Sequence, residues 1–547
     1  MQTDKLINNR NIVYGLFLLC VAISIILKLN ILEVGAPFVT IDDNTTYEGG
    51  FLVWFGQAPP QRMYIESWIN GLSSIITYIL FQLSNGGSLG VNLVADAYNH
   101  YLTAPDLYVK SYRLVSLCID LLTAYFVYLT AKIILPHRQH IPALLVTSLY
   151  LLSYNAIWCY VVARPDTPMA LLSTVGLYFY YRSDFGKHFN SFLLAALFLG
   201  MATGMKLHGA FFVVFIILDL FRVHKFRAFF SYVLPFGFLS VIAFSVAAGS
   251  VLFDPLTYIK LRALNVKDDV SPWIVWGEQF IQIIKGTGVF VVPLIILSLV
   301  MLIKNAHLRQ NNKIVSVLLL SVLWLLLFSS IRQLRAYWML PVLPLFYIIA
   351  TYTLFELKNK ALSITATAMM LCLMIFQSYQ QSNEFKQVPY NELRNWVEKN
   401  VQIKEKLFIF GYDALFLPLS KDATEVFSLG YTQLMKEAKE NGESYTERHV
   451  RFWEERTKLK LIDMYNLKDQ GFAYYSYYKT PLEDFSDLIG FDSMDYIVVL
   501  DGFVSNTINI DLLIKSKYTK VTTVVGPGGG GSGLTYTVYQ KVGSIEK

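Results

Sequence analysis

Long apolar runs separated by short polar segments make up the first two thirds of the chain. A helix that crosses a bilayer needs about 20 mostly apolar residues. Eleven runs meet or approach this length: 12–32, 112–135, 141–161, 166–181, 190–205, 208–221, 228–250, 284–303, 314–330, 336–354 and 361–378. A further run, Trp68–Leu83, contains several polar residues, and we interpret it as an amphipathic helix in the membrane interface. The pattern predicts an α-helical polytopic membrane protein with about 11 transmembrane helices.

The last part of the chain has a different pattern, with short apolar runs in a polar background. Residues 407–411 and 496–500 predict buried strands because each run ends in a Gly or Asp turn. Further elements are expected at 391–400 and 432–457 (helices) and at 521–525 and 534–538 (a hairpin). We therefore predict a C-terminal α/β domain, 379–547, after a membrane module, 1–378, whose largest external loop is 33–111.

Composition supports the membrane assignment and limits the partners. Of the 547 residues, 54% are hydrophobic and 16% are charged, whereas soluble domains carry about 25% charged residues. The net charge is +6, but no soluble segment carries a Lys/Arg cluster that could neutralise a run of phosphates. We therefore expect the lipid bilayer, and not nucleic acid, as a partner.

Basic residues predict how the chain is oriented. If the N-terminus is cytoplasmic, the short loops on that side are all basic: 136–140, 182–188, 222–227, 304–313 and 356–360. This is the bias that orients membrane proteins. The first apolar run is too long for a signal-peptide core, so we treat it as a retained span. The sequence predicts a multi-pass protein of the cytoplasmic (inner) membrane, with the N-terminus inside and the C-terminal domain outside.

The candidate chemistry begins at Asp42 and Asp43, directly after the first span. Tyr47 and Glu48 follow within the same stretch. An Asp pair here could be a solvated loop or a helix N-cap, since Asp is favoured at both. A carboxylate at the outer membrane surface could also take a proton from an acceptor hydroxyl, which is the work of a general base.

Several motifs together resemble one family. The acidic pair with its following tyrosine resembles the first external loop of GT-C fold glycosyltransferases, closest to the protein O-mannosyltransferase and lipid A aminoarabinose-transferase group. The resemblance continues, in order, at these segments: 112–116 with Arg113, 163–166 with Arg164 and Asp166, 204–209 with Lys206, and 335–344 with Arg335 and Tyr337. There are departures: Asp43 stands where the family often has Glu, Met205 stands where it has Thr, and residues 85–110 form an insertion.

The resemblance implies a donor sugar on a polyprenyl phosphate, and an acceptor that is a lipid, a glycan or a protein. A phosphate at the membrane face needs fixed cations. The implied phosphate ligands are Lys206, Arg335, Arg332 and Arg113, and the implied substrate-binding residues are Tyr47, Glu48, Arg164, Asp166 and Tyr337. Each cation could instead reach a lipid headgroup. Asp166 could pair with Arg164 or cap a helix, Asp120 could pair with a basic group, and Asp219 is expected to be structural.

We predict no metal and no other cofactor. The sequence has no Cys or His spacing typical of zinc. Asp42 and Asp43 could hold a hard divalent ion, but the users of lipid-phosphate sugars that this pattern resembles do not obviously need one.

The predicted function is transfer of a sugar from a polyprenyl-phosphate-linked donor to an acceptor hydroxyl at the outer membrane face, with inversion and with Asp42 or Asp43 as base. The alternative is a transporter, flippase or polymerase for lipid-linked glycans. A transporter predicts inverted repeats and broken helices, and we see neither in the sequence. A role as a receptor with a membrane anchor would leave eleven spans unexplained.

Overall fold

The computed structural model divides the chain into two compact units. One comprises residues 1–32, 63–66 and 113–382, and the other comprises 33–62, 67–112 and 383–547. The structure describes residues 10–32, 50–51, 54, 65–103, 105–135, 140–161, 165–225, 229–248, 272–304, 310–329, 336–386, 389–401, 405–410, 473–477, 495–500, 518–525 and 535–542. The described part of the first unit is helical, and that of the second combines helices with a sheet.

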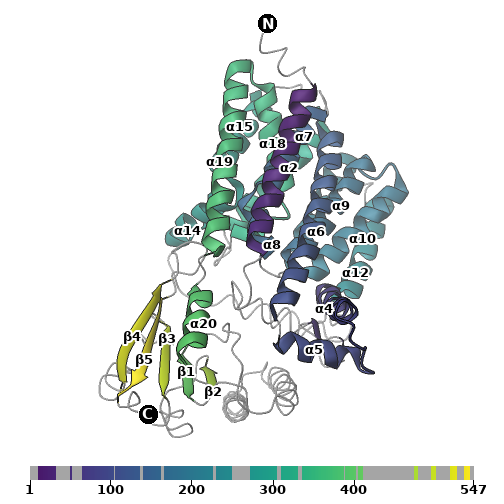
Figure 1. Cartoon of the computed structure of the whole chain (residues 1–547). Coiled ribbons are helices and arrows are strands. Elements are labelled where there is room, and N and C mark those ends of the chain that lie inside the picture. The colour runs from purple at the N-terminus through teal and green to yellow at the C-terminus, as the bar shows by residue number, and fades with distance from the viewer. Residues whose placement is uncertain are drawn as a thin grey trace. The chain divides into compact units, whose positions relative to one another are not determined.

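A bundle of helices forms the first unit (Figure 1). Its elements are α2 (Arg10–Leu32), α6 (Pro105–Ile134, from Arg113 on), α7 (His140–Leu151), α8 (Tyr154–Val161), α9 (Asp166–Arg182), α10 (Phe189–Met205), η2 (Leu207–Gly209), α11 (Ala210–His224), η4 (Phe229–Val233), α12 (Leu234–Ala248), α14 (Pro272–Thr287), α15 (Val291–Lys304), α17 (Asn312–Ser329), η6 (Ala336–Met339), α18 (Leu343–Glu356) and α19 (Lys360–Lys386). A helix lies at every one of the eleven predicted apolar runs.

Three of these runs are interrupted, contrary to the prediction of continuous spans. The run 141–161 is two helices, α7 and α8, bent by 46°. The run 284–303 is divided between α14 and α15, which meet at 93°. Gly288 lies at this break with φ +94°, a conformation that is open to glycine at little cost. In the run 336–354, α18 begins only at Leu343, after a 3₁₀ turn.

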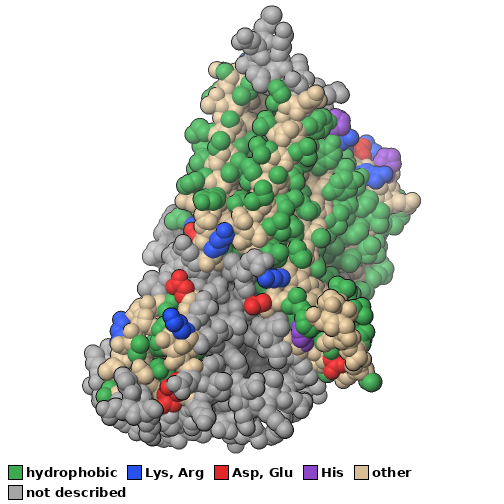
Figure 2. All heavy atoms as spheres, in the orientation of Figure 1, with side chains coloured by type: hydrophobic (Ala, Val, Ile, Leu, Met, Phe, Trp, Pro, Cys, Tyr) green, Lys and Arg blue, Asp and Glu red, His purple; other side chains and the backbone are tan. Residues whose placement is uncertain are grey.

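The number of membrane spans therefore stays a prediction. Among the described residues, five helices are long and apolar enough to cross a membrane, or seven if each bent pair counts as one span. Hydrophobic side chains cover most of the visible outer surface of the bundle, and its few charged side chains lie toward its ends (Figure 2). Leu18 and Phe238, for example, are 64% and 69% exposed. Such a surface suits contact with lipid.

Two features fix the interior of the bundle. A Cβ on Gly200 would lie 2.8 Å from Ala243 Cβ, and one on Gly204 would lie 3.0 Å from Ala248 N, so α10 and α12 pack with their backbones close together. Elsewhere, Lys28 on α2 forms a buried ion pair with Asp120 on α6. This confirms the expectation that Asp120 pairs with a basic group.

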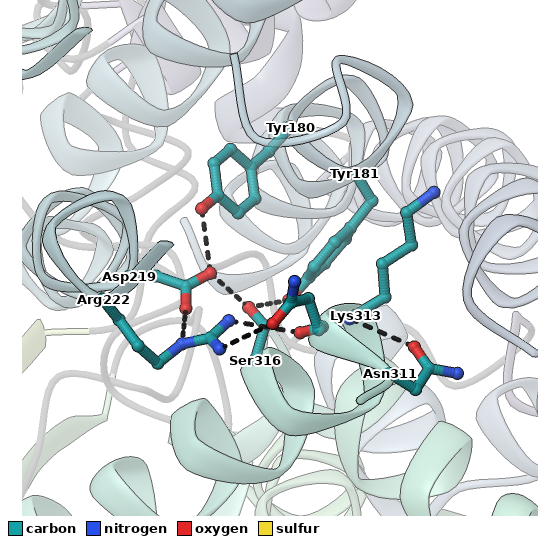
Figure 3. Close-up of polar contacts among 8 residues, drawn as sticks. Tyr180, Tyr181, Asp219, Arg222, Asn311, Lys313 and Ser316 are labelled. Carbon is teal, nitrogen blue, oxygen red and sulfur yellow. Dashed lines mark hydrogen bonds and ion pairs between the residues drawn. The ribbon is translucent and has the colours of Figure 1, made fainter. Parts of the chain in front are cut away.

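A polar cluster joins α9, α11 and α17 (Figure 3). Asp219 is 2% exposed, and its Oδ2 accepts hydrogen bonds from Tyr180 (2.9 Å) and Ser316 (2.6 Å). Its Oδ1 pairs with Arg222 Nε at 2.7 Å. The same guanidinium donates to the side chain and the backbone oxygen of Asn312. Both carboxylate oxygens are thus occupied, as a structural role for Asp219 requires.

The second unit contains a five-stranded sheet in the order β2-β1-β3-β5-β4. The strands are β1 (Lys406–Phe410), β2 (Ala473–Tyr477), β3 (Tyr496–Leu500), β4 (Tyr518–Val525) and β5 (Thr535–Lys541). β1 is parallel to β2 and β3, whereas β5 is antiparallel to β3 and β4. The predicted strands, the terminal hairpin and the helix α20 (Pro389–Asn400) are confirmed, and β2 was not foreseen. The predicted helix 432–457 lies outside the described residues.

Helices α4 (Ile65–Ser84) and α5 (Leu93–Thr103) form the other described part of the second unit, together with the first turns of α6. The predicted helix at Trp68–Leu83 is confirmed as α4. It exposes an apolar stripe that includes Leu72 and Leu80, and it buries polar residues such as Asn70 and Ser74. The predicted insertion 85–110 is therefore largely helical.

Candidate functional site

Lys206 lies at the end of α10, where the chain leaves the helix. Its backbone is extended, with φ −156° and ψ 134°, and the 3₁₀ turn η2 follows at once. Gly209 closes this turn through a hydrogen bond from its N–H to the Lys206 oxygen (2.8 Å). A Cβ on Gly209 would lie 2.5 Å from Thr203 N, so the tight turn that presents Lys206 needs a glycine here.

Lys206 forms an ion pair with Asp166, the first residue of α9. The Nζ–Oδ1 distance is 2.8 Å, and the side chains are 15% and 0% exposed. Oδ2 of Asp166 is buried, and no described residue donates a hydrogen bond to it. This oxygen is thus an acceptor that none of the described residues uses. Asp166 therefore pairs with Lys206, which was not foreseen, and Arg164, the partner that one alternative expected, lies outside the described residues.

Aromatic rings surround the lysine ammonium. Its Nζ lies 5.3 Å from the centre of the Tyr337 ring and 5.1 Å from that of Trp338, within cation–π range. Tyr337 stacks on Trp158 with centroids 4.4 Å apart and planes 10° apart, and Trp338 contacts the His208 ring at 4.5 Å. Rings from α8, η2 and η6 thus gather at one ion pair. The predicted residues Lys206, Asp166 and Tyr337 come together.

Two further contacts hold the elements that carry these rings. Asn155 on α8 donates from Nδ2 to the backbone oxygen of Gly286 on α14 (3.0 Å). A Cβ on Gly286 would lie 2.8 Å from the Ala336 oxygen, so α14 and η6 are in close backbone contact. These contacts hold α8 and α14 against each other and against η6, which carries Tyr337 and Trp338.

Arg113 donates hydrogen bonds to the ends of two helices. It is 1% exposed, and its guanidinium donates to the backbone oxygens of Ile31 (3.1 Å), Leu32 (3.5 Å) and Val161 (3.4 Å). These are the carboxyl ends of α2 and α8, where orphan carbonyls need donors. Arg113 thus ties two helix ends together, and its predicted contact with a donor phosphate stays a prediction.

The remaining predicted site residues lie outside the described residues. They are Asp42, Asp43, Tyr47, Glu48, Arg164, Arg332 and Arg335. Their roles as base, phosphate ligands and substrate contacts stay predictions. Among the described residues, no three His, Cys, Asp or Glu side chains form a group that could hold a metal ion.

Sequence reasoning missed an aromatic cluster in the second unit. Phe51 is fully buried among Tyr98, Tyr101 and Tyr108, with ring centroids at 5.2, 5.4 and 6.2 Å. His100 hydrogen-bonds the Tyr108 hydroxyl at 2.9 Å, and its partial burial lowers its pKa below the usual range. The signal in the sequence was the recurrence of tyrosines at 98, 101 and 108 on the helical insertion.

The fold is similar to that of ArnT from Cupriavidus metallidurans. The structure of ArnT bound to undecaprenyl phosphate matches with a TM-score of 0.50 and 11% identity over 97% of this chain and 98% of ArnT. The apo structure matches with a TM-score of 0.50 and 11% identity over 96% and 98%. The archaeal oligosaccharyltransferase AglB from Archaeoglobus fulgidus, solved with an inhibitory peptide and a dolichol-phosphate, aligns with a TM-score of 0.44 and 10% identity over 94% of this chain and 74% of AglB. The protein therefore has the GT-C fold, and the predicted fold class is confirmed.

One family model also matches the sequence. Residues 89–270 match the model of the dolichyl-phosphate-mannose-protein mannosyltransferase family, and no curated protein matches the chain. The matched segment contains Asp166 and Lys206. The family match and the shared fold agree with the resemblance and with the glycosyltransferase class that the sequence predicted.

Proposed function

We propose that this enzyme transfers a sugar from a polyprenyl-phosphate-linked donor to an acceptor hydroxyl at the outer face of the cytoplasmic membrane, with inversion. The observation that carries the proposal is the Lys206–Asp166 pair within its wall of aromatic rings. A lysine ammonium is a suitable ligand for a phosphate, and a carboxylate beside aromatic faces is suited to a sugar. A polyprenyl-phosphate sugar carries both the phosphate and the sugar in one molecule.

The choice of donor draws support from the comparisons. The matching family is described by its use of dolichyl-phosphate mannose, and ArnT, which shares the fold, was solved with undecaprenyl phosphate. We propose a phosphodiester-linked donor of the same chemistry for this chain. The acceptor is a lipid, glycan or protein hydroxyl.

Each site residue has a proposed role. Lys206 binds the donor phosphate together with Arg335, Arg332 and Arg113. Asp42 or Asp43 takes the proton from the acceptor hydroxyl, whose oxygen attacks the anomeric carbon while the polyprenyl phosphate leaves as an anion. The remaining proposed substrate contacts are Tyr47, Glu48, Arg164, Asp166 and Tyr337. No metal is required in this scheme.

The test is donor binding and turnover with purified protein and a panel of polyprenyl-phosphate sugars. We expect wild type to bind one donor, Lys206→Ala to lose binding, and at least one of Asp42→Asn and Asp43→Asn to bind without turnover. Lys187→Ala is the matched control, because Lys187 is 65% exposed and paired with Asp184. A wild type that binds no donor, or variants that all behave like wild type, would contradict the proposal.

The transporter alternative needs one correction. Its predicted broken helices, which the sequence did not reveal, are present at α7–α8 and α14–α15. These breaks occur in a chain whose fold is also that of ArnT, so they do not by themselves favour transport. Vesicles loaded with donor separate the two functions: an enzyme forms glycosylated acceptor, whereas a flippase only moves intact donor between leaflets.

A further inference from the structure

The indole N–H of Trp338 is a buried hydrogen-bond donor at the candidate site. Trp338 lies in η6 (Ala336–Met339), and its side chain is partly exposed, whereas its Nε1 atom is buried. No described residue accepts a hydrogen bond from this atom. A buried indole N–H usually has a partner, so an N–H that the described residues leave unmatched calls for a physical explanation.

The ring of Trp338 has contacts that do not involve its N–H. Lys206 Nζ lies 5.1 Å from the centre of this ring, and the His208 ring lies 4.5 Å from it. A phenylalanine ring would also attract the lysine ammonium. The cation–π contact therefore accounts for an aromatic residue at position 338 but not for the buried N–H of a tryptophan.

An unused acceptor lies beside the same lysine. Asp166 Oδ1 binds Lys206 Nζ at 2.8 Å, and Asp166 Oδ2 is buried with no hydrogen-bond donor among the described residues. One N–H and one carboxylate oxygen, both buried and unmatched, therefore belong to side chains that contact a single ammonium. A hydroxyl group both accepts and donates hydrogen bonds, so a molecule with several hydroxyls beside Lys206 can satisfy both atoms.

We propose that Trp338 is a specificity-determining residue, whose Nε1–H donates to a hydroxyl oxygen of the donor sugar while Asp166 Oδ2 accepts from a sugar hydroxyl. The inference rests on the proposed function and extends it, because it assigns the indole N–H to the sugar and leaves the phosphate to Lys206. A site that hydrogen-bonds a substrate hydroxyl rejects the analogue that lacks it, since a buried polar group of the site then stays unpaired. Trp338 thus selects sugars that carry a hydroxyl at the matching position.

The variant that tests this inference is Trp338→Phe, which keeps an aromatic face for Lys206 and removes the N–H. Trp324→Phe is the matched control, because it makes the same change on α17, where the ring packs on Phe211 and Phe212. The probes are the undecaprenyl-phosphate sugar that wild type turns over, its derivatives lacking one sugar hydroxyl at a time, and undecaprenyl phosphate without a sugar. The dissociation constant of each probe is measured with wild type and with both variants.

The readout is the factor by which removal of each hydroxyl weakens binding. We expect removal of one particular hydroxyl to weaken binding to wild type at least about fivefold. The same factor should be at least about threefold smaller in Trp338→Phe, because the N–H that it leaves unpaired is already absent, and it should keep its wild-type value in Trp324→Phe. Undecaprenyl phosphate carries no sugar, so a change in its affinity reports only on the support that the ring gives to Lys206.

A decrease of this factor for one hydroxyl, in Trp338→Phe and not in Trp324→Phe, supports the inference. Factors equal to those of wild type for every derivative overturn it and leave the proposed function intact. If wild type binds no polyprenyl-phosphate sugar, the proposed function itself fails first. Should Trp338→Phe not fold, benzothienylalanine incorporated at position 338 replaces the N–H by sulfur in a ring of similar shape, and the same comparison decides.

Discussion

Two buried aspartates, Asp166 on α9 and Asp219 on α11, lie near opposite ends of α9 and have different hydrogen-bond partners. Helix α9 carries Asp166 in its first turn and Tyr180, which binds Asp219, near its end. Both aspartates are almost fully buried. Asp219 has donors on both oxygens, from Tyr180, Ser316 and Arg222. Asp166 has Lys206 on one oxygen and no described donor on the other.

Among the described residues, the donors thus satisfy both oxygens of Asp219 but only one oxygen of Asp166. A satisfied buried network stabilises one packing of its helices. An incompletely satisfied one costs free energy, which is typical of positions where a substrate completes the hydrogen bonding. The two aspartates are similarly buried but differ in their described donors, and this difference is the basis of the substrate role proposed for Asp166.

The largest effect on stability should follow Asp219→Ala. Removing this carboxylate leaves Arg222, Tyr180 and Ser316 without their acceptor, and breaking a buried pair typically costs about 3–5 kcal/mol. Thermal unfolding of the purified protein measures it. Donor binding per folded molecule should be unchanged, and a loss of binding at normal stability would mean that Asp219 also serves the substrate.

Lys206→Ala should come next and should affect both stability and donor binding. It leaves Asp166 as an unpaired buried carboxylate, at a cost of about 3 kcal/mol. The double variant Lys206→Ala with Asp166→Asn should recover most of that stability without recovering donor binding. If the double variant binds donor, Lys206 serves Asp166 and not the phosphate.

Asp166→Asn should have a smaller effect on stability, about 1–2 kcal/mol, because the amide keeps one oxygen for Lys206. The normalised turnover should nevertheless fall clearly, because the second oxygen of Asp166, the acceptor proposed for the sugar, is replaced by an amide nitrogen. Asp219→Asn should instead lower the stability and leave the normalised turnover nearly unchanged. Thermal unfolding and turnover of the two variants, measured side by side, test the comparison directly.

Acidification should give the smallest effect. Burial lowers the pKa of His100 in the fold, so the neutral form is favoured there. The stability that this provides is present above the unfolded pKa of about 6.5 and is lost as the pH falls through that value toward the lower folded pKa. The unfolding temperature should fall over this range in wild type and fall less in His100→Phe. An equal decrease of the unfolding temperature with pH in wild type and His100→Phe would contradict a role for His100.

Much of the fold was accessible from the sequence, and particular elements show why the rest was not. The strands at 407–411 and 496–500 are strongly apolar and bounded by turn residues, so they were predicted. β2, with the sequence Ala473–Tyr477, contains Ser and alternates too weakly to stand out. The break at Gly288 was hidden because a lone glycine in an apolar run is usually tolerated in a helix.

The candidate site, too, could be predicted only in part from the sequence. Lys206 and Asp166 were each singled out, but their pairing joins residues 40 positions apart in sequence, which local patterns do not encode. The aromatic cluster around Phe51 depends on the packing of α5 against a residue that precedes it by about fifty positions. A sequence pattern predicts faces of single helices, whereas these contacts arise from how the helices pack.

The placement of the Lys206–Asp166 pair at two helix ends has an electrostatic consequence. Asp166 stands in the first turn of α9, and Lys206 is the C-cap of α10. The aligned peptide dipoles of a helix favour an anion at its N-terminus and a cation at its C-terminus. Each charge is therefore stabilised by its own helix as well as by its partner. If Lys206 turns to a donor phosphate as proposed, the helix dipoles would still support both charges.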